Sequence, residues 1–208
     1  MRRSRPERPA KEKEQIFSPA ISTVILAGRF TLRIEHYSFD NGEGGVESLD
    51  ASYVERSEPE KSAVAKIITD GVRELRKHGK NVVIVYPVPE VGWWVPTTLQ
   101  KMSMRQMRDG LTTSYEVYKA RNKSAFESLD RIPDDGHIVR VRPDLIFCHT
   151  FVANRCAANN GSDVFYHDDD HLSVKGADLV VGRMMEKVRG AWGGFPAPSD
   201  GSVIGSLR

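Results

Sequence analysis

Long apolar runs are missing from this chain. No stretch approaches the ~18 consecutive apolar residues that a membrane-spanning helix needs. The basic start, residues 1–9, is followed by charged residues 11–14 and lacks the apolar stretch of a secretory signal peptide. We therefore expect neither a transmembrane segment nor a signal peptide, and the chain as written would stay in the cytoplasm.

A strong charge of either sign is also missing. The 208 residues carry a net charge of +2, with 39% hydrophobic and 28% charged residues. This balance is ordinary for a globular protein and gives no reason to expect nucleic acid as a partner. The length suits one domain with tails. We predict a polar, disordered arm over residues 1–20, a single domain over residues 21–190, and a disordered tail rich in glycine, proline and serine over residues 191–208.

Cysteine is scarce, since only Cys148 and Cys156 occur, with seven residues between them. A zinc knuckle places roughly two to four residues between its ligands, so this pair does not fit one. A disulfide across so short a loop is sterically possible, but disulfides belong to oxidising compartments. The cysteines therefore hint at export while the start of the chain argues against it, and the residues alone leave this conflict open.

Two apolar runs with a helix between them indicate a βαβ unit. Residues 22–27 and 81–86 are rich in β-branched residues, as strands buried in a parallel sheet are. Between them, Ser57 and Glu60 can form a capping box at the start of a helix with one apolar face. Gly79 suits the left-handed position that ends such a helix. The pattern predicts an α/β fold with a right-handed crossover.

The remaining segments extend this α/β pattern. The glycine-rich residues 38–56 predict a mobile loop. A long helical region is expected to break near Asp109 and Gly110. In all, we predict strands at 22–27, 81–86 and 138–141, and helices at 58–78, 98–129 and 174–190.

One polar cluster dominates the second half of the chain. Three carboxylates and two imidazoles occupy positions 167–171, between a short apolar run and a helix that Ser173 can cap. In α/β enzymes, chemistry is placed at the carboxyl ends of strands. Across such a turn, Asp168 can reach Nδ1 of His171, fix the tautomer, and leave Nε2 free as general base for a serine hydroxyl. The spacing alone is a weak signal, and it makes Asp168 and His171 candidates for a catalytic pair.

Other interpretations of these residues remain open. His167, Asp168, Asp170 and His171 are of metal-ligand types, but five adjacent residues rarely converge on one ion. A solvated acidic turn without any chemistry is the simplest alternative. Arg29, which directly follows the first strand, is either a surface arginine at a strand exit or part of an active-site rim.

The residues of this cluster and its flanks resemble a known family. Residues 166–173, followed by Gly176 and Ala177, resemble the last block of the SGNH hydrolase-type domain of acyltransferase-3 family polysaccharide O-acyltransferases. Residues 24–30 resemble the family's apolar strand that ends in an Arg-aromatic pair. Residues 85–90 resemble its strand that ends in Pro-x-Pro-Glu, and the two cysteines resemble its short cysteine loop. The resemblance spans the predicted domain, and the last block is its most specific part.

The resemblance implies a three-layer α/β/α, flavodoxin-like sheet, here incomplete at its N-terminus. By position, Asp168 would orient and His171 would act as the base in a Ser-His-Asp mechanism. Arg29 would hold an oxyanion or a sugar. Cys148 and Cys156 would form a disulfide, because the family domain faces the periplasm and is delivered by a preceding membrane part.

The implied activity is transfer or hydrolysis of O-acyl groups, such as acetyl, on cell-surface polysaccharide. The expected partners are the acylated polysaccharide or acyl donor and an upstream membrane acyltransferase domain; no cofactor is expected. The family's nucleophile is the serine of Gly-Asp-Ser, and this tripeptide is absent from the chain. We therefore expect the C-terminal part of an SGNH domain that is inactive alone. The alternative is a non-catalytic remnant or a glycan-binding accessory module.

Overall fold

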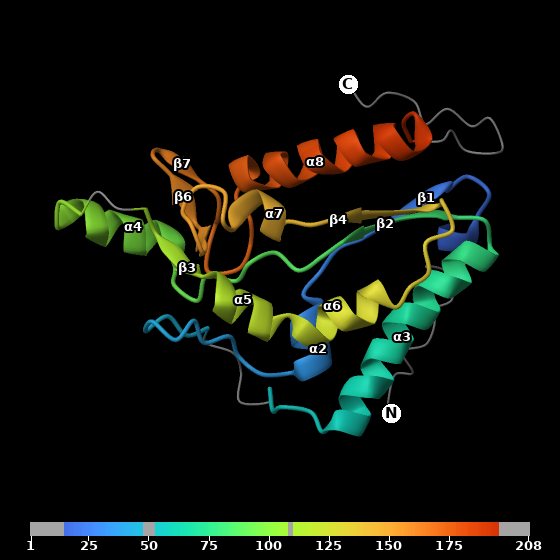
Figure 1. Ribbon diagram of the computed structural model, residues 1–208, viewed down its shortest axis with the longest axis horizontal. Coiled ribbons are helices and arrows are strands. Elements are labelled where there is room, and N and C mark those ends of the chain that lie inside the picture. Colours follow the sequence, from blue (N-terminus) through green and yellow to red (C-terminus); the bar gives the residue numbers. More distant parts are fainter. Residues whose placement is uncertain (1–14, 48–52, 108–109, 196–208) are drawn as a thin grey trace, which may run out of the picture.

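The computed structural model describes residues 15–47, 53–107 and 110–195, which form a mixed α/β body (Figure 1). Its sheet has three parallel strands in the order β1-β2-β4, and all three are predicted strands. In the register, Ile25 pairs with Val83, and Val83 with Val139. The strands are β1 at Thr23–Leu26, β2 at Asn81–Val85 and β4 at Ile138–Val141.

Helices cover both faces of this sheet (Figure 1). Side chains alternate along β2, so that Val83 and Val85 pack with α8 while Val82 and Ile84 pack with the helices of the opposite face. This confirms the predicted three-layer α/β/α architecture. The helix on one side is α8 at Val174–Trp192, and those on the other are α2 at Phe30–Glu35, α3 at Glu58–Lys77 and α6 at Lys123–Asp130.

Strand β1 lies at the edge of the sheet. Among the described residues it pairs with β2 alone, and Ile25 keeps 47% of its surface exposed. Val24 and Leu26 point to the opposite face, where they pack with the helix layer. Within the described residues, the outer edge of β1 is therefore without a strand partner and Ile25 is partly uncovered, as is typical of an edge strand.

The first long helix begins as predicted. The backbone N–H of Ser57 donates to the Glu60 carboxylate at 2.9 Å, which completes the capping box. Gly79 has φ of +71°, in the left-handed region that glycine adopts without strain. Local capping chemistry therefore located both ends of α3 from the sequence.

The predicted helix over residues 98–129 is divided more finely than expected. A short strand interrupts it and pairs antiparallel with a later one, because Thr112 and Thr113 find partners in Ala157 and Cys156. Ser114 then caps the next helix by accepting from Val117 N–H at 3.3 Å. The observed elements are α4 at Val95–Met104, β3 at Thr112–Ser114, α5 at Tyr115–Arg121 and β5 at Arg155–Ala157.

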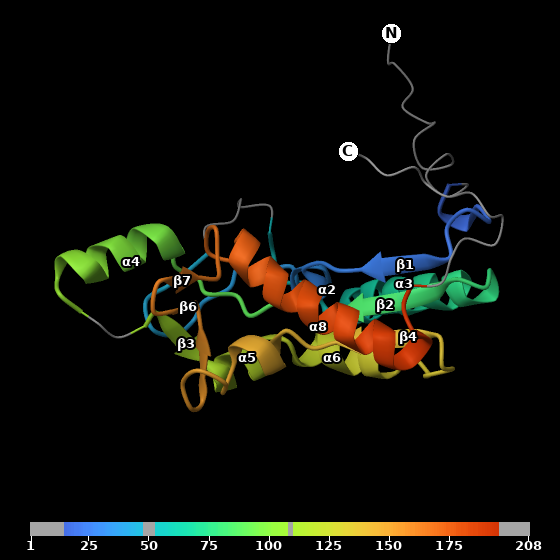
Figure 2. The ribbon, with the colours of Figure 1, turned by 90° about the horizontal axis from the view of Figure 1, so that it is seen from above.

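Several short elements lie beyond the carboxyl ends of the strands. The arrow of β1 points toward the side of the molecule that carries α4 and the β6–β7 hairpin (Figure 2). These short pieces were not predicted. The β6–β7 hairpin is local, with Asn159 paired to Val164 and Asn160 to Asp163, and α7 has only four residues. The short pieces are α7 at Asp144–Phe147, β6 at Asn159–Asn160 and β7 at Asp163–Val164.

The glycine-rich loop is anchored where it is described, which corrects the expectation of a free loop. Asn41 is fully buried, and its Nδ2 donates to the carbonyl of Val91 at 2.9 Å. Its Oδ1 accepts from the backbone N–H groups of Glu43 and Gly45. A buried asparagine that bonds on both sides holds residues 38–47 in place. Residues 48–52 lie outside the described residues.

The predicted arm and tail fall largely outside the described residues. The end of the arm is described, and there Phe17 packs against the helix layer while Ser18 accepts from Lys80 Nζ at 2.6 Å. The ordered body therefore includes residues from the predicted arm. Among the helices of the described ranges, none has the length and apolar character needed to cross a membrane.

Candidate active site

The site is built on a tight turn between a short apolar segment and α8. His167 N–H donates to the carbonyl of His171 at 2.8 Å, and Ser173 N–H donates to that of Phe165 at 2.9 Å. The Ser173 hydroxyl accepts from Gly176 N–H at 3.1 Å and so caps α8, as predicted. The turn thus leads directly into a capped helix.

Gly176 allows this helix to approach the turn closely. A Cβ atom at this position would lie 2.1 Å from the carbonyl oxygen of Phe165, a distance that atoms cannot adopt. Only glycine fits where two backbones meet in this way. The first turn of α8 and the segment before the acidic turn are therefore in direct backbone contact.

Asp168 and His171 are brought together as the sequence predicted. Asp168 Oδ2 lies 2.9 Å from Nδ1 of His171, while Oδ1 accepts the backbone N–H groups of Asp170 and His171 at 3.0 and 2.7 Å. Burial raises the pKa of Asp168, but the two backbone bonds and the contact with the His171 imidazole together outweigh it, so the pKa lies below its usual value. The carboxylate therefore stays ionised beside the imidazole.

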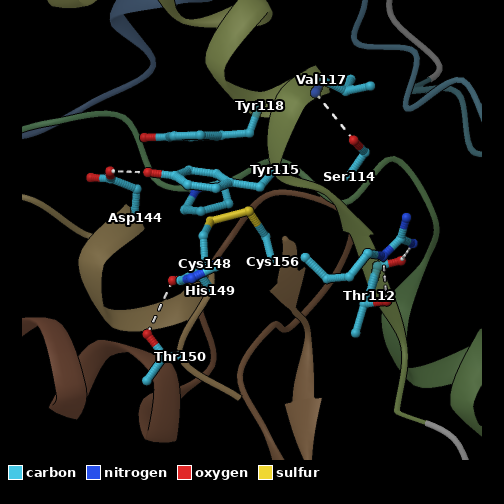
Figure 3. The surroundings of a disulfide bond; sticks show 12 residues. Thr112, Ser114, Tyr115, Val117, Tyr118, Asp144, Cys148, His149, Thr150 and Cys156 are labelled. Atoms are coloured by element: carbon cyan, nitrogen blue, oxygen red, sulfur yellow. Dashed lines mark hydrogen bonds between the residues drawn. A yellow bond between two sulfur atoms is a disulfide. The ribbon is translucent and has the colours of Figure 1, made fainter. Parts of the chain in front are cut away.

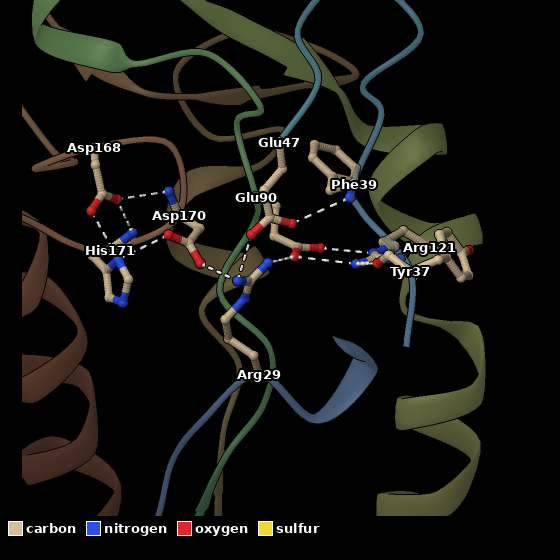
Figure 4. Close-up of polar contacts among 9 residues, drawn as sticks. All are labelled: Arg29, Tyr37, Phe39, Glu47, Glu90, Arg121, Asp168, Asp170 and His171. Atoms are coloured by element: carbon tan, nitrogen blue, oxygen red, sulfur yellow. Dashed lines mark hydrogen bonds and ion pairs between the residues drawn. The ribbon is translucent and has the colours of Figure 1, made fainter. Parts of the chain in front are cut away.

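The imidazole of His171 is exposed on its other side. Its side chain keeps 71% of its surface accessible, and the second ring nitrogen points away from both carboxylates (Figure 4). The negative charge of Asp170 is the main cause that raises the pKa of His171. An oriented imidazole with an open Nε2 is the arrangement that a general base requires.

Asp170 is a second carboxylate on the same ring nitrogen. Its Oδ1 lies 2.8 Å from Nδ1 of His171, and its Oδ2 lies 2.8 Å from Nη1 of Arg29. Only 5% of its side chain is exposed. Burial raises the pKa of Asp170 to about 6, although Arg29 and His171 both favour its charged form. Sequence analysis considered Asp170 only as a candidate metal ligand.

Arg29 joins three acidic side chains. Its Nη1 also lies 2.6 Å from Glu47, and its Nη2 lies 2.6 Å from Glu90 (Figure 4). Burial lowers the pKa of Arg29, but the bonds to Glu47 and Glu90 outweigh this effect and raise it. Both terminal nitrogens are thus engaged, and this geometry favours a linking role over the predicted contact with an oxyanion or sugar.

Glu90 extends the network to α5. Arg121 Nε donates to Glu90 Oε2 at 2.9 Å, and the side chains are 4% and 9% exposed. The guanidinium also lies 4.5 Å from the centre of the Tyr37 ring, which adds a cation–π contact. Sequence analysis placed Glu90 at a strand end but gave it no role, and no local signal marked Glu47 or Arg121.

Two buried tyrosines hold the loop that carries Glu90. Tyr118 donates its hydroxyl to the Pro87 carbonyl at 2.8 Å, and Tyr166 donates to that of Pro89 at 2.7 Å. Burial raises the pKa of both tyrosines, so they remain neutral donors. The loop also bonds to the acidic turn, because the backbone N–H of Val91 donates to the carbonyl of Asp169 at 2.8 Å. Loop and turn are therefore fixed to each other.

A pocket of about 240 Å³ opens beside the imidazole at the carboxyl ends of β1 and β2. Arg29, Asp170 and His171 all line it. Its apolar wall includes Ala27, Leu32, Val88 and Leu172. A small group with an apolar end can enter this space and reach the imidazole.

The metal interpretation fits these contacts less well. Donor atoms of Asp168, Asp170 and His171 lie within 4.8 Å of one another, and His167 is not part of that group. Asp170 is already paired with Arg29, and Nδ1 of His171 faces two carboxylates, as a nitrogen that carries a proton does. A metal bound through that nitrogen would need it without its proton. The geometry favours an oriented base.

The cysteines form the disulfide that the resemblance implied. Cys148 is bonded to Cys156, and both are almost fully buried. Tyr118 packs against the bond, and Tyr115 lies beside it with its hydroxyl bonded to Asp144 at 3.3 Å (Figure 3). The bond fastens the segment after α7 to β5.

Comparison with known families agrees with this architecture. The family model described as "SGNH domain (fused to AT3 domains)" matches residues 3–186. The chain belongs to this family. Membership in the SGNH domain family indicates chemistry of the hydrolase or acyltransferase type. Searches of curated proteins and of solved structures found no match.

Proposed function

We propose that this SGNH domain supplies the general base and its orienting carboxylate for transfer or hydrolysis of O-acyl groups on cell-surface polysaccharide, with acetyl as the group carried. The observation that carries the proposal is the pairing of Asp168 with Nδ1 of His171, while Nε2 points away from both carboxylates on a side chain that is 71% exposed. In acyl transfer, such an imidazole accepts the proton of an attacking serine and returns it to the leaving sugar oxygen.

The serine is proposed to come from outside these 208 residues, because Gly-Asp-Ser does not occur in them. The open edge of β1 is the place where a further strand can join the sheet in parallel. A hydroxyl at the carboxyl end of that strand would lie on the side of Arg29, which follows β1 and lines the pocket with His171. Active-site groups gather at this edge in α/β sheets.

The site is proposed to work outside the cytoplasm, beside a membrane acyltransferase domain. The supporting observation is the disulfide between Cys148 and Cys156, since such bonds persist in oxidising compartments. The acylated polysaccharide or the acyl donor would be the partner that enters the pocket. No residue of the site requires a cofactor for this chemistry.

The test is made in the organism that carries the gene. His171→Ala should lower the O-acetyl content of the surface polysaccharide to that of a gene deletion, measured as acetate released by alkali. His167→Ala is the matched control, because this exposed neighbour belongs to the same turn. Full O-acetylation in the His171→Ala strain would refute the proposal and favour a module that only binds glycan.

A second measurement tests the origin of the serine. The purified chain should not hydrolyse a small acetyl ester faster than its His171→Ala variant. Turnover that disappears in the variant would mean that a hydroxyl within the chain is the nucleophile. His171 would then still be the general base, but the proposal that the serine comes from outside these residues would be wrong.

A further inference from the structure

We propose that Asp170 is a positioning residue that couples Arg29 to the His171 imidazole, so that the contacts of Arg29 set how firmly the base is held and charged. This inference rests on the proposed role of His171 as general base. It concerns a carboxylate that the Asp168–His171 pair does not require.

The two carboxylates on Nδ1 are anchored in different ways. Asp168 is held by the turn itself, because its second oxygen accepts two backbone N–H groups. Asp170 is held from another part of the chain, because its second oxygen faces Arg29 at the end of β1. One carboxylate therefore fixes the imidazole locally, and the other connects it to the rest of the molecule.

The buried charges around Arg29 do not cancel. Three acidic groups, Glu47, Glu90 and Asp170, face the two cations Arg29 and Arg121. The excess negative charge is not neutralised within the network, and Asp170 presents it to the imidazole. An imidazolium at His171 would balance it, which favours the protonated state that a base reaches during catalysis.

Arg29 and His171 compete for Asp170. A firm contact between Arg29 and Asp170 weakens the negative field at Nδ1, and a looser contact strengthens it. Arg29, Asp170 and His171 also line the same pocket. An anionic group in the pocket that drew Arg29 away from Asp170 would leave the charge of Asp170 less shielded at Nδ1 and make His171 a stronger base.

The test is an NMR titration of the His171 Hε1 resonance in the purified chain, with fold checked by backbone spectra. The groups that face His171 are Asp168 and Asp170 on its own turn and Arg29 after β1, while Glu47 and Glu90 act through Arg29. Asp170→Asn should move the titration midpoint to lower pH. Asp169→Asn is the matched control with the same charge change on the same turn, and its shift should be smaller.

Arg29→Lys tests the coupling in the opposite direction. Lysine keeps the charge but cannot contact three carboxylates with a planar fork. The contact with Asp170 should weaken, the negative field of Asp170 at Nδ1 should strengthen, and the midpoint should rise. This variant carries the test alone if Asp170→Asn does not fold. An unchanged midpoint in Arg29→Lys, or equal shifts in Asp170→Asn and Asp169→Asn, would overturn the coupling.

The titration needs neither substrate nor nucleophile, so it separates this inference from the proposed function. If the titration midpoints shift as expected but a His171→Ala strain keeps normal O-acetylation, only the proposed function is refuted. Lost O-acetylation in that strain together with unchanged midpoints would refute only the role of Asp170.

Discussion

Strands β1 and β2 are neighbours in one sheet, yet they are held in different ways. β2 is packed on both faces, with Val82, Val83 and Ile84 fully buried. β1 has one strand partner among the described residues, leaves Ile25 47% exposed, and ends at the ion pairs of Arg29. Packing on both faces therefore fixes the centre of the sheet, whereas β1 is packed on one face and its end is held by charge contacts beside the proposed site.

The largest loss of stability should come from breaking the ion pairs that link the ends of β1 and β2. Glu90→Gln removes the carboxylate shared by Arg29 and Arg121. Loss of one partner from a buried ion pair costs about 3–5 kcal/mol, because the remaining charge is left uncompensated. We expect a loss of that order in urea unfolding, with hydrogen exchange accelerated more in β1 than in β2.

A surface pair provides the control for this variant. Glu43 pairs with Arg155, and both side chains are about one-third exposed. Glu43→Gln should cost under about 1 kcal/mol, because solvent screens exposed pairs. Equal losses in the two variants would mean that Glu90 is no more than a surface contact.

The next largest loss of stability is expected from truncating isoleucine, and its size should differ between the two strands. Ile84 is fully buried and Ile25 is half exposed. Ile84→Ala should destabilise the fold by about 2–5 kcal/mol through lost burial and a cavity, whereas Ile25→Ala should cost under about 1 kcal/mol. Chemical unfolding of both variants measures the difference. Similar losses would show that Ile25 is covered in solution and that β1 is not an open edge.

The smallest change in stability should come from pH, through the titration of Asp170 and His171 beside the end of β1. Burial raises the pKa of Asp170 to about 6, and the charge of Asp170 raises that of His171. The folded state thus binds both protons more tightly than the unfolded chain does. The associated stability is present at low pH and is lost as pH rises through the folded pKa values.

Urea unfolding between pH 4 and pH 8 measures this dependence. The stability of the wild type relative to Asp170→Asn should fall steadily as pH rises, because the asparagine has no proton to lose. Asp168, whose pKa is lowered, acts with the opposite sign below its ordinary pKa. A difference that stays constant across the range would contradict the assignment of the raised pKa to Asp170.

Local patterns were sufficient to predict the main helices and strands and the contact between Asp168 and His171. The β-branched runs, the capping box of Ser57 and Glu60, and the spacing of Asp168 and His171 act between residues close in the chain. Their physical causes are therefore visible in short stretches of sequence. The roles of Asp168 and His171 in catalysis remain predictions, although their side chains meet as expected.

Long-range contacts account for what was missed. Glu47, Glu90 and Arg121 converge on Arg29's side of the sheet only because distant loops and α5 are brought to one edge. The same holds for the β3–β5 pair and for Asn41, whose partner Val91 lies in another loop. No periodicity or cap encodes such convergence, so a sequence can mark strand ends as a site without specifying which charges meet there.

The backbone contact at Gly176 has a mechanical consequence. No side chain lies between the first turn of α8 and the Phe165 carbonyl, so nothing at that point can yield by changing rotamer. α8 spans 19 residues and is anchored through Val180 and Val188 in the main core. The start of α8 and the segment before the acidic turn are therefore joined through backbone atoms, so a shift of α8 would act directly on the backbone that leads to His171.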